Sequence, residues 1–139
     1  MISVLIVGKG NVGTHLYKAF LNADNIIVTQ INSRKLESVP KADVTIIAVS
    51  DDAIAEVSSK ITNSFVVHTS GACSINELNN KGNKGVFYML QTFSKDKKID
   101  FSEVPFCLEA ENENDYQLLV KLAKSIGKKT SKSDGQNTE

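Results

Sequence analysis

The sequence predicts an α/β protein whose doubly wound, mainly parallel sheet forms a single domain. Two observations carry this prediction. Short runs of β-branched and aliphatic residues recur along the chain, as expected for parallel strands that helices cover on both faces. Segments with apolar residues at helical spacing separate these runs, and this alternation is typical of a parallel sheet with helical crossovers.

The apolar runs place the expected strands at residues 2–7, 26–31, 44–49, 65–67, 86–88 and 106–108, with one last short strand after residue 127. Helical spacing marks the inner faces of the helices, namely Val12, Leu16, Ala19 and Phe20; Ile54, Val57 and Ile61; Ile75 and Leu78; and Leu119, Leu122, Ala123 and Ile126. The connection over residues 32–43 is too short for a full helix and strand, so we expect an abbreviated crossover. The domain should cover residues 1–134, followed by a polar tail at 135–139.

Composition excludes several classes of function. The 139 residues include sixteen basic and sixteen acidic side chains, so the net charge is zero. A general nucleic-acid or membrane-surface protein would show a basic excess, and neither partner is expected. Cys73 and Cys107 lack the spacing of a metal site, which predicts two free thiols and no metal. No targeting segment is recognisable, so a cytoplasmic location is expected.

A glycine-rich turn follows the first strand and opens the first helix. Residues 8–13 read GKGNVG, a GxGxxG element in the strand-to-helix context that a dinucleotide-binding fingerprint requires. Gly8 would permit the tight turn, Gly10 would let the backbone approach a pyrophosphate, and Gly13 would let the helix lie close to the strand. The amides near Asn11 and Val12 would face the phosphates at the positive end of the helix dipole. The alternative is a plain strand-to-helix turn.

The end of the second strand predicts which nucleotide fits. An acidic residue there would bind the ribose hydroxyls of NAD or of S-adenosylmethionine, but the sequence has Asn32, Ser33 and Arg34 instead. Asn32 and Ser33 can donate hydrogen bonds, and Arg34, the only arginine of the chain, can pair with a 2′-phosphate. NADP is therefore favoured over NAD, with a solvated basic turn as the alternative.

Polar residues also end the third and fourth strands, at the edge of the sheet where ligands bind. Ser50 and Asp51 end the third strand, and Asp51 is expected to cap the next helix rather than act as an acid. His68 ends the fourth strand, near the expected nicotinamide. Its ring could donate a proton or orient a substrate oxygen, or backbone hydrogen bonds could simply hold it there. The segment at 91–94 adds polar groups whose role the chemistry leaves open.

Six segments occur in an order that resembles a known family: GKGNVG, INSR, AVSDDAI, VHTSG, FYMLQTFS and PFCLEA. Together they are similar to the N-terminal, Rossmann-like NADP-binding domain of a poorly characterised bacterial oxidoreductase family. That family is similar to the deazaflavin-dependent NADP oxidoreductases and to pyrroline carboxylate reductase. The resemblance covers the chain from residue 1 to about residue 134.

The resemblance implies a Rossmann domain followed, in full-length relatives, by a helical domain that supports dimerisation and closes the active site. Carried over by position, the implied cofactor-binding residues are Gly8, Gly10, Asn11, Val12, Gly13, Ser33, Arg34, Val49, Ser50 and Ser70. Met89 departs from the relatives, which usually have proline there. The chain also ends at residue 139, where relatives enter the helical domain, so a truncated product and a stand-alone domain are both open.

Three functions are compatible with these residues. The first is the cofactor domain of an NADP-dependent oxidoreductase, which transfers hydride to a small imine or carbonyl compound and is inactive without its second domain. The second is a non-catalytic nucleotide-binding or redox-sensing module. The third, a methyltransferase that uses S-adenosylmethionine, is disfavoured by the missing acidic residue after the second strand. A homodimer is an open alternative for all three.

Overall fold

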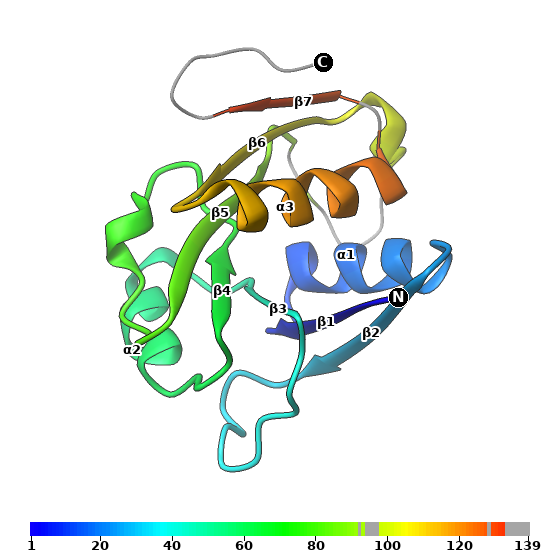
Figure 1. The fold of residues 1–139 in the computed structure, drawn as a ribbon. Coiled ribbons are helices and arrows are strands. Elements are labelled where there is room, and N and C mark those ends of the chain that lie inside the picture. Colours follow the sequence, from blue (N-terminus) through cyan, green and yellow to red (C-terminus); the bar gives the residue numbers. More distant parts are fainter. Residues whose placement is uncertain (92, 94–97, 128, 133–139) are drawn as a thin grey trace.

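A seven-stranded sheet runs through the molecule in the order β2-β1-β3-β4-β5-β6-β7 (Figure 1). The computed structural model describes residues 1–91, 93, 98–127 and 129–132. The polar tail predicted at 135–139 lies outside these residues. The strands are β1 (Ile2–Val7), β2 (Ile26–Ile31), β3 (Val44–Ile47), β4 (Phe65–His68), β5 (Asn83–Met89), β6 (Pro105–Ala110) and β7 (Lys129–Lys132). The predicted α/β class and mainly parallel sheet are confirmed, because all neighbouring strands are parallel except β5 and β6.

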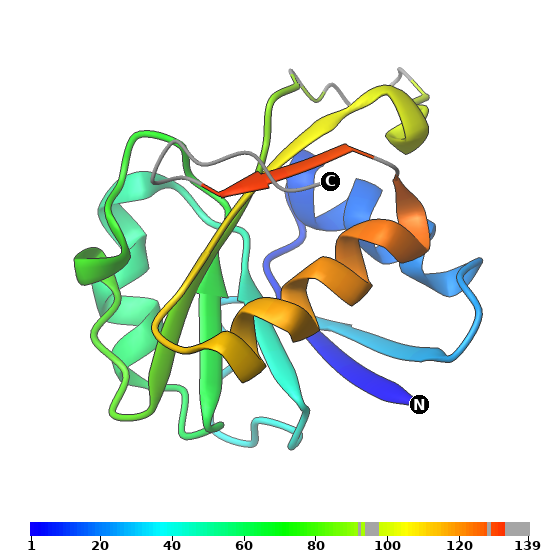
Figure 2. The same ribbon diagram turned by 45° about the horizontal axis from the view of Figure 1, so that its top comes forward.

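Helices cover both faces of this sheet (Figures 1 and 2). The α-helices are α1 (Asn11–Leu21), α2 (Ile54–Ser59) and α3 (Glu113–Ile126), and the short 3₁₀ turns are η1 (Asp51–Ala53), η2 (Ile75–Glu77) and η3 (Phe101–Glu103). Helices α1 and α3 lie on one face, and α2 lies on the other. The molecule is therefore doubly wound, as the alternation of patterns predicts.

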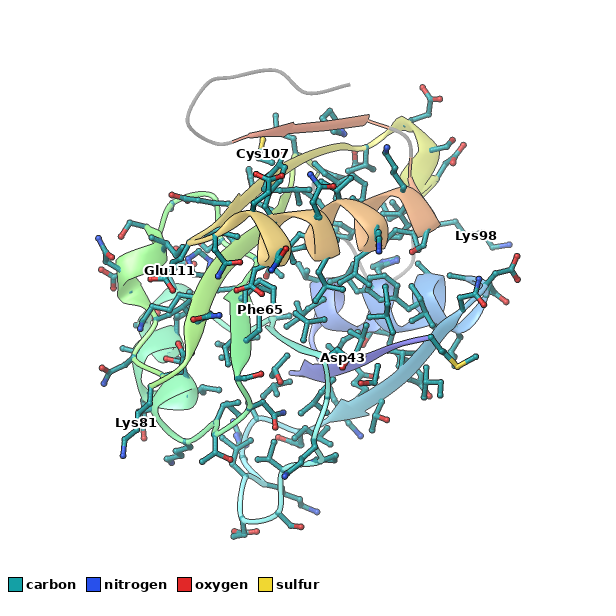
Figure 3. All side chains as sticks on the ribbon, in the orientation of Figure 1. Asp43, Phe65, Lys81, Lys98, Cys107 and Glu111 are labelled. Carbon is teal, nitrogen blue, oxygen red and sulfur yellow. The ribbon has the colours of Figure 1, made fainter. Side chains whose placement is uncertain are left out.

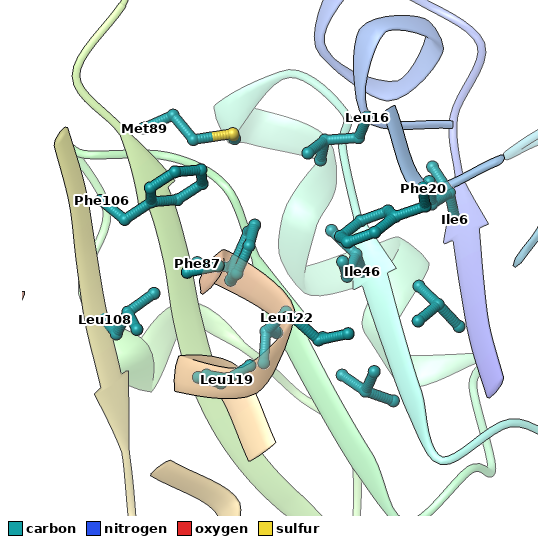
Figure 4. Packing of buried hydrophobic residues seen from close by; sticks show 14 of the residues in the cluster. Ile6, Leu16, Phe20, Ile46, Phe87, Met89, Phe106, Leu108, Leu119 and Leu122 are labelled. Carbon is teal, nitrogen blue, oxygen red and sulfur yellow. The ribbon is translucent and has the colours of Figure 1, made fainter. Parts of the chain in front are cut away.

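The larger core lies between the sheet and the α1–α3 layer (Figure 4). Phe20 of α1, Phe87 of β5 and Phe106 of β6 are fully buried, and their rings contact one another in sequence, with centroids 6.5 Å and 5.4 Å apart. Fully burying such a side chain stabilises the fold by roughly 1.5–3 kcal/mol. This core fixes α1, and with it the turn that precedes α1, against the sheet.

The predicted abbreviated crossover is confirmed, because residues 32–43 contain neither helix nor strand. Two pairs of hydrogen bonds near the end of this connection hold it in place. The Ser3 backbone N–H donates to a carboxylate oxygen of Asp43 at 2.9 Å, and the Asp43 N–H returns a bond to the Ser3 carbonyl at 3.0 Å. Asp43 is labelled in Figure 3. The buried Asn63 side chain donates to the Pro40 carbonyl at 3.0 Å and to the Thr45 hydroxyl at 2.9 Å. Both contacts tie the connection to the first and third strands.

One helix start differs from the prediction. Asp51 was expected to cap the helix after β3, but it lies inside the 3₁₀ turn η1, whose N-cap is Ser50. Neither Ser50 nor Ala53, the N-cap of α2, forms a side-chain capping bond. The prediction was wrong because the chain turns one residue earlier than the cap preference indicates, and this brings Ser50 to the sheet edge.

Candidate dinucleotide site

A groove of about 900 Å³ opens at the carboxyl ends of the parallel strands. Its walls come from the turns after β1, β2, β4 and β5, from the end of β3 and from α2. Of the residues predicted from the sequence, the groove is lined by Gly8, Gly10, Asn11, Val12, Ser33, Arg34, Val49 and Ser50. Gly13, Asn32, His68 and Ser70 were also predicted but are not among the lining residues. Three separate segments that the sequence analysis singled out thus meet at one groove.

Gly8 is glycine because the fold requires it. Its backbone φ is +124°, and a Cβ there would lie 2.3 Å from the Ala48 carbonyl oxygen of β3. The Gly8 N–H donates to the Ile31 carbonyl at 2.9 Å, and the Gly8 carbonyl accepts from the Gln30 side chain, also at 2.9 Å. A side chain would therefore separate the turn from the two strands that flank β1.

Gly13 has a packing role behind the groove wall. It is buried on α1, and a Cβ there would lie 2.5 Å from the Gly8 carbonyl oxygen. The absence of a side chain lets the first turn of α1 rest directly on the glycine turn, as the fingerprint predicts. Gly13 thus affects the groove indirectly, by allowing α1 to pack against the turn that lines it.

Gly10 differs from both of these glycines. It is the N-cap of α1, with an extended backbone conformation (φ −79°, ψ −166°) that any residue can adopt. Apart from its chain neighbours, no described residue has an atom within 4 Å of the position that a Cβ would take, and Gly10 lines the groove. It also offers no side-chain cap, so the first-turn N–H groups of α1 lack both intrahelical and capping partners. The open space above Gly10 therefore faces a positive helix end.

The turn after β2 presents Ser33 and Arg34 to the groove. Asn32 does not line it, because its side-chain oxygen accepts the Arg34 backbone N–H at 2.9 Å and closes the turn. Arg34 is exposed and has no ion-pair partner among the residues that the structure describes. The guanidinium is thus available to a ligand, while Asn32 sets the direction of the backbone.

Helix α2 contributes a wall that the sequence analysis missed. Ala53, Glu56, Val57 and Lys60 line the groove at positions i, i+3, i+4 and i+7. This helical stripe is a signal that the sequence contains, although Val57 alone was assigned, and only to the core. Glu56 and Lys60 form an exposed ion pair at 3.7 Å, a geometry that stabilises little and yields readily to a ligand.

Backbone groups hold the His68 ring by hydrogen bonds, which is the second of the two roles predicted for it. The side chain is fully buried, and the Ser70 backbone N–H donates to Nδ1 at 3.0 Å. Because Nδ1 accepts, the ring proton lies on Nε2, which is 3.0 Å from the Ser74 carbonyl oxygen and donates to it. Both ring nitrogens are therefore used within the protein. The arrangement favours a structural role, and His68 does not reach the groove.

Near the end of β4, other residues line the groove in place of the predicted His68 and Ser70. Thr69 lines it, whereas the Ser70 hydroxyl accepts the Ala72 N–H at 3.2 Å. From the predicted 91–94 segment, Gln91 and Phe93 line the groove, and positions 92 and 94 lie outside the described residues. The Asn11 side chain donates to the Phe93 carbonyl at 3.4 Å and joins this segment to the start of α1.

Two features are absent from the described residues. They contain no helix that is long and apolar enough to cross a membrane. They also contain no group of three or more His, Cys, Asp or Glu side chains placed to hold a metal ion. Cys73 and Cys107 are not joined by a disulfide bond.

Comparison with solved structures places this fold among Rossmann-type oxidoreductases. The putative NADP oxidoreductase of Bacteroides fragilis matches with a TM-score of 0.83 and 28% identity, over 95% of this chain and 60% of that one. Pyrroline carboxylate reductase of Plasmodium falciparum, solved with NADP bound, matches with a TM-score of 0.66 and 14% identity, over 94% of this chain and 57% of that one. A semialdehyde dehydrogenase NAD-binding protein of Cupriavidus necator, in complex with calcium and NAD, matches with a TM-score of 0.68 and 17% identity, over 95% and 63% of the two chains.

These likenesses confirm the predicted resemblance to an NADP oxidoreductase domain and to pyrroline carboxylate reductase. The chain spans about three-fifths of the length of these structural neighbours. No family model matches the sequence, and no curated protein sequence matches it.

Substitutions at two of the fingerprint glycines, Gly8 and Gly10, should affect stability differently. Replacing Gly8 with Ala should lower the free energy of unfolding by about 1–3 kcal/mol, because an L-residue is strained at this φ and the Cβ meets Ala48. Replacing Gly10 with Ala should lower it by no more than about 1 kcal/mol, the usual loss when alanine takes an N-cap position. Urea denaturation of both variants measures this difference. Equal destabilisation by the two substitutions would contradict the assignment of Gly10 to a ligand rather than to the fold.

Proposed function

We propose that the groove binds NADP(H) and that the chain is the cofactor domain of an oxidoreductase. Hydride transfer to a small imine or carbonyl compound is the proposed reaction. The cofactor would supply the hydride, while Gly8, Gly10 and the start of α1 would hold its pyrophosphate and Arg34 its 2′-phosphate. The oxidoreductase neighbours and the chemistry of the groove both support this proposal.

Gly10 is the observation that carries the proposal. Neither the backbone conformation nor a steric contact with a described residue requires glycine there, since the conformation is ordinary and the space beside it is open. A pyrophosphate that approaches the backbone gives such a reason, because a side chain would occupy its place. Unpaired N–H groups on the first turn of α1 then supply hydrogen bonds, and the helix dipole favours the negative charge.

The turn after β2 supports a preference for NADP over NAD. Asn32, Ser33 and Arg34 provide no carboxylate that would repel a 2′-phosphate. Arg34 has no protein partner to give up among the described residues, so a charge-assisted bond to phosphate would come without a competing loss. Lys60 lines the same groove, and its weak pair with Glu56 leaves it able to join.

Arg34 should govern the choice of cofactor. We expect Arg34→Ala to weaken NADP(H) binding by about 1.5–3 kcal/mol, the value of a hydrogen bond to a charged group, and to leave NAD(H) binding almost unchanged. Calorimetric titration of both cofactors measures this. Lys35→Ala is the matched control, because Lys35 is the next exposed cation but does not line the groove. Equal losses for the two cofactors would refute the assignment of Arg34.

A larger side chain at Gly10 should separate binding from folding. Gly10→Val should abolish dinucleotide binding, because its branched side chain projects into the space above the helix start. Circular dichroism and urea denaturation should show a folded protein, since the added carbons meet no protein atom near the Cβ. Undiminished affinity in the folded variant would place the ligand elsewhere.

Turnover distinguishes an oxidoreductase domain from a nucleotide-binding or redox-sensing module. His68, the one proton donor predicted near the nicotinamide, is buried and fully bonded, which favours binding without chemistry by the described residues alone. We expect the 139-residue polypeptide, assayed by itself, to bind NADPH and not to oxidise it across a panel of imines, ketones and deazaflavins. NADPH oxidation faster than about 1 s⁻¹, an ordinary enzyme rate, would contradict this expectation.

A further inference from the structure

Strand β2 is an unprotected edge of the sheet. Its six residues, IIVTQI, pair with β1 in unbroken register and include no charge and no proline. Proteins usually protect edge strands with lysine, proline, bulges or short length, because an open edge pairs with other chains. The opposite edge strand, β7, has only four residues and begins and ends with lysine. Strands β2 and β7 form the two ends of the sheet (Figure 1), and they differ in length and in charge.

The register identifies which backbone groups of β2 face outward. Asn25 and Ile31 accept bonds from the N–H groups of Ile2 and Gly8, so the odd-numbered residues of β2 bond to β1. The N–H and C=O groups of Ile26, Val28 and Gln30 therefore point away from the sheet. No described residue donates to or accepts from these outward backbone groups. They form a row of three residues that is ready to bond with another strand.

An exposed apolar side chain lies beside this row. Ile27 is 57% exposed, and Thr29 on the same face of the strand is also exposed. At the far end of that face Ile31 is partly buried and packs against the smaller core, as do Leu36 and Val39 of the connection over residues 32–43. The first half of β2 thus combines unpaired backbone with an uncovered isoleucine.

We propose that β2 is a self-association surface that takes a second copy of this chain. The two β2 strands pair antiparallel about a two-fold axis at Val28, so that Val28 lies opposite its own copy and Ile26 lies opposite Gln30. Every outward-facing residue then meets another outward-facing residue, and each such pair exchanges two backbone hydrogen bonds. Ile27 lies opposite Thr29 of the copy, which covers it. The sheets of the two copies become one continuous sheet.

The charges that flank β2 select this antiparallel orientation. Exposed Asp24 precedes the strand, and exposed Lys35, which does not line the groove, follows it. Antiparallel pairing brings the acidic end of each strand beside the basic end of the other, whereas parallel pairing would bring like charges together. A closed two-fold dimer also uses up both β2 edges, so association stops at two copies.

A charge at Ile27 should prevent this association. Sedimentation equilibrium of the full chain should give twice the monomer mass, and Ile27→Lys should raise the dissociation constant of the dimer at least about tenfold, because it places two ammonium groups across the axis. Leu90→Lys is the matched control, since Leu90 is 53% exposed and lies beyond β5, four strands from β2. It should leave the dimer intact. A monomeric wild type, or a dimer that Leu90→Lys disrupts and Ile27→Lys does not, would overturn the proposal.

Disulfide formation should report the register. In a background without Cys73 and Cys107, Ile27→Cys and Thr29→Cys variants should form a covalent dimer when mixed, because directly opposed residues of a non-hydrogen-bonded pair lie about 4.5 Å apart between Cα atoms. Each variant alone should stay uncrosslinked, because its cysteines lie diagonally, at about 7–8 Å, beyond disulfide reach. Crosslinking of either variant alone, or no crosslinking in the mixture, would contradict the proposed pairing.

Discussion

The structure depends on the close approach of Gly8 to the end of β3. At this point the chain leaves β1, and no room exists for a side chain between it and Ala48. The same residue bonds to β2 through its N–H and its carbonyl, and its carbonyl oxygen supports Gly13 of α1 from below. Three strands and one helix therefore meet at one residue, and the groove lies directly in front of it.

Under the proposed function, this construction would make nucleotide recognition largely a property of the backbone. Helix N–H groups and the open space above Gly10 face the groove without help from a side chain, while Arg34 adds charge from a separate turn. Side chains elsewhere on the sheet are free to change as long as they fill the core. Structures that share only 14% and 28% of their residues with this chain accordingly keep the same fold.

The sequence predicts the glycine turn and the strand ends well, because both depend on local constraints. Six apolar runs predict six strands that the structure contains. The GKGNVG motif predicts the turn between β1 and α1. The antiparallel direction of β6 is not predictable from a run of apolar residues, which carries no information about strand direction. The burial of His68 is equally hidden, because it depends on the return of the chain to Ser74. Likewise, Lys60 reaches the groove only because α2 packs in one particular orientation.

The connection over residues 32–43 links β2 to β3 without adding a strand or a helix of its own. Asn63 and Asp43 hold its second half, whereas its first half, with Ser33 and Arg34, is fixed mainly by the Asn32 turn. The residues that we propose to face the nucleotide ribose are thus outside the hydrogen-bond ladders of the sheet. Mutations there can accumulate without a folding penalty, so coenzyme preference in this scaffold is open to evolutionary drift and to redesign by loop exchange.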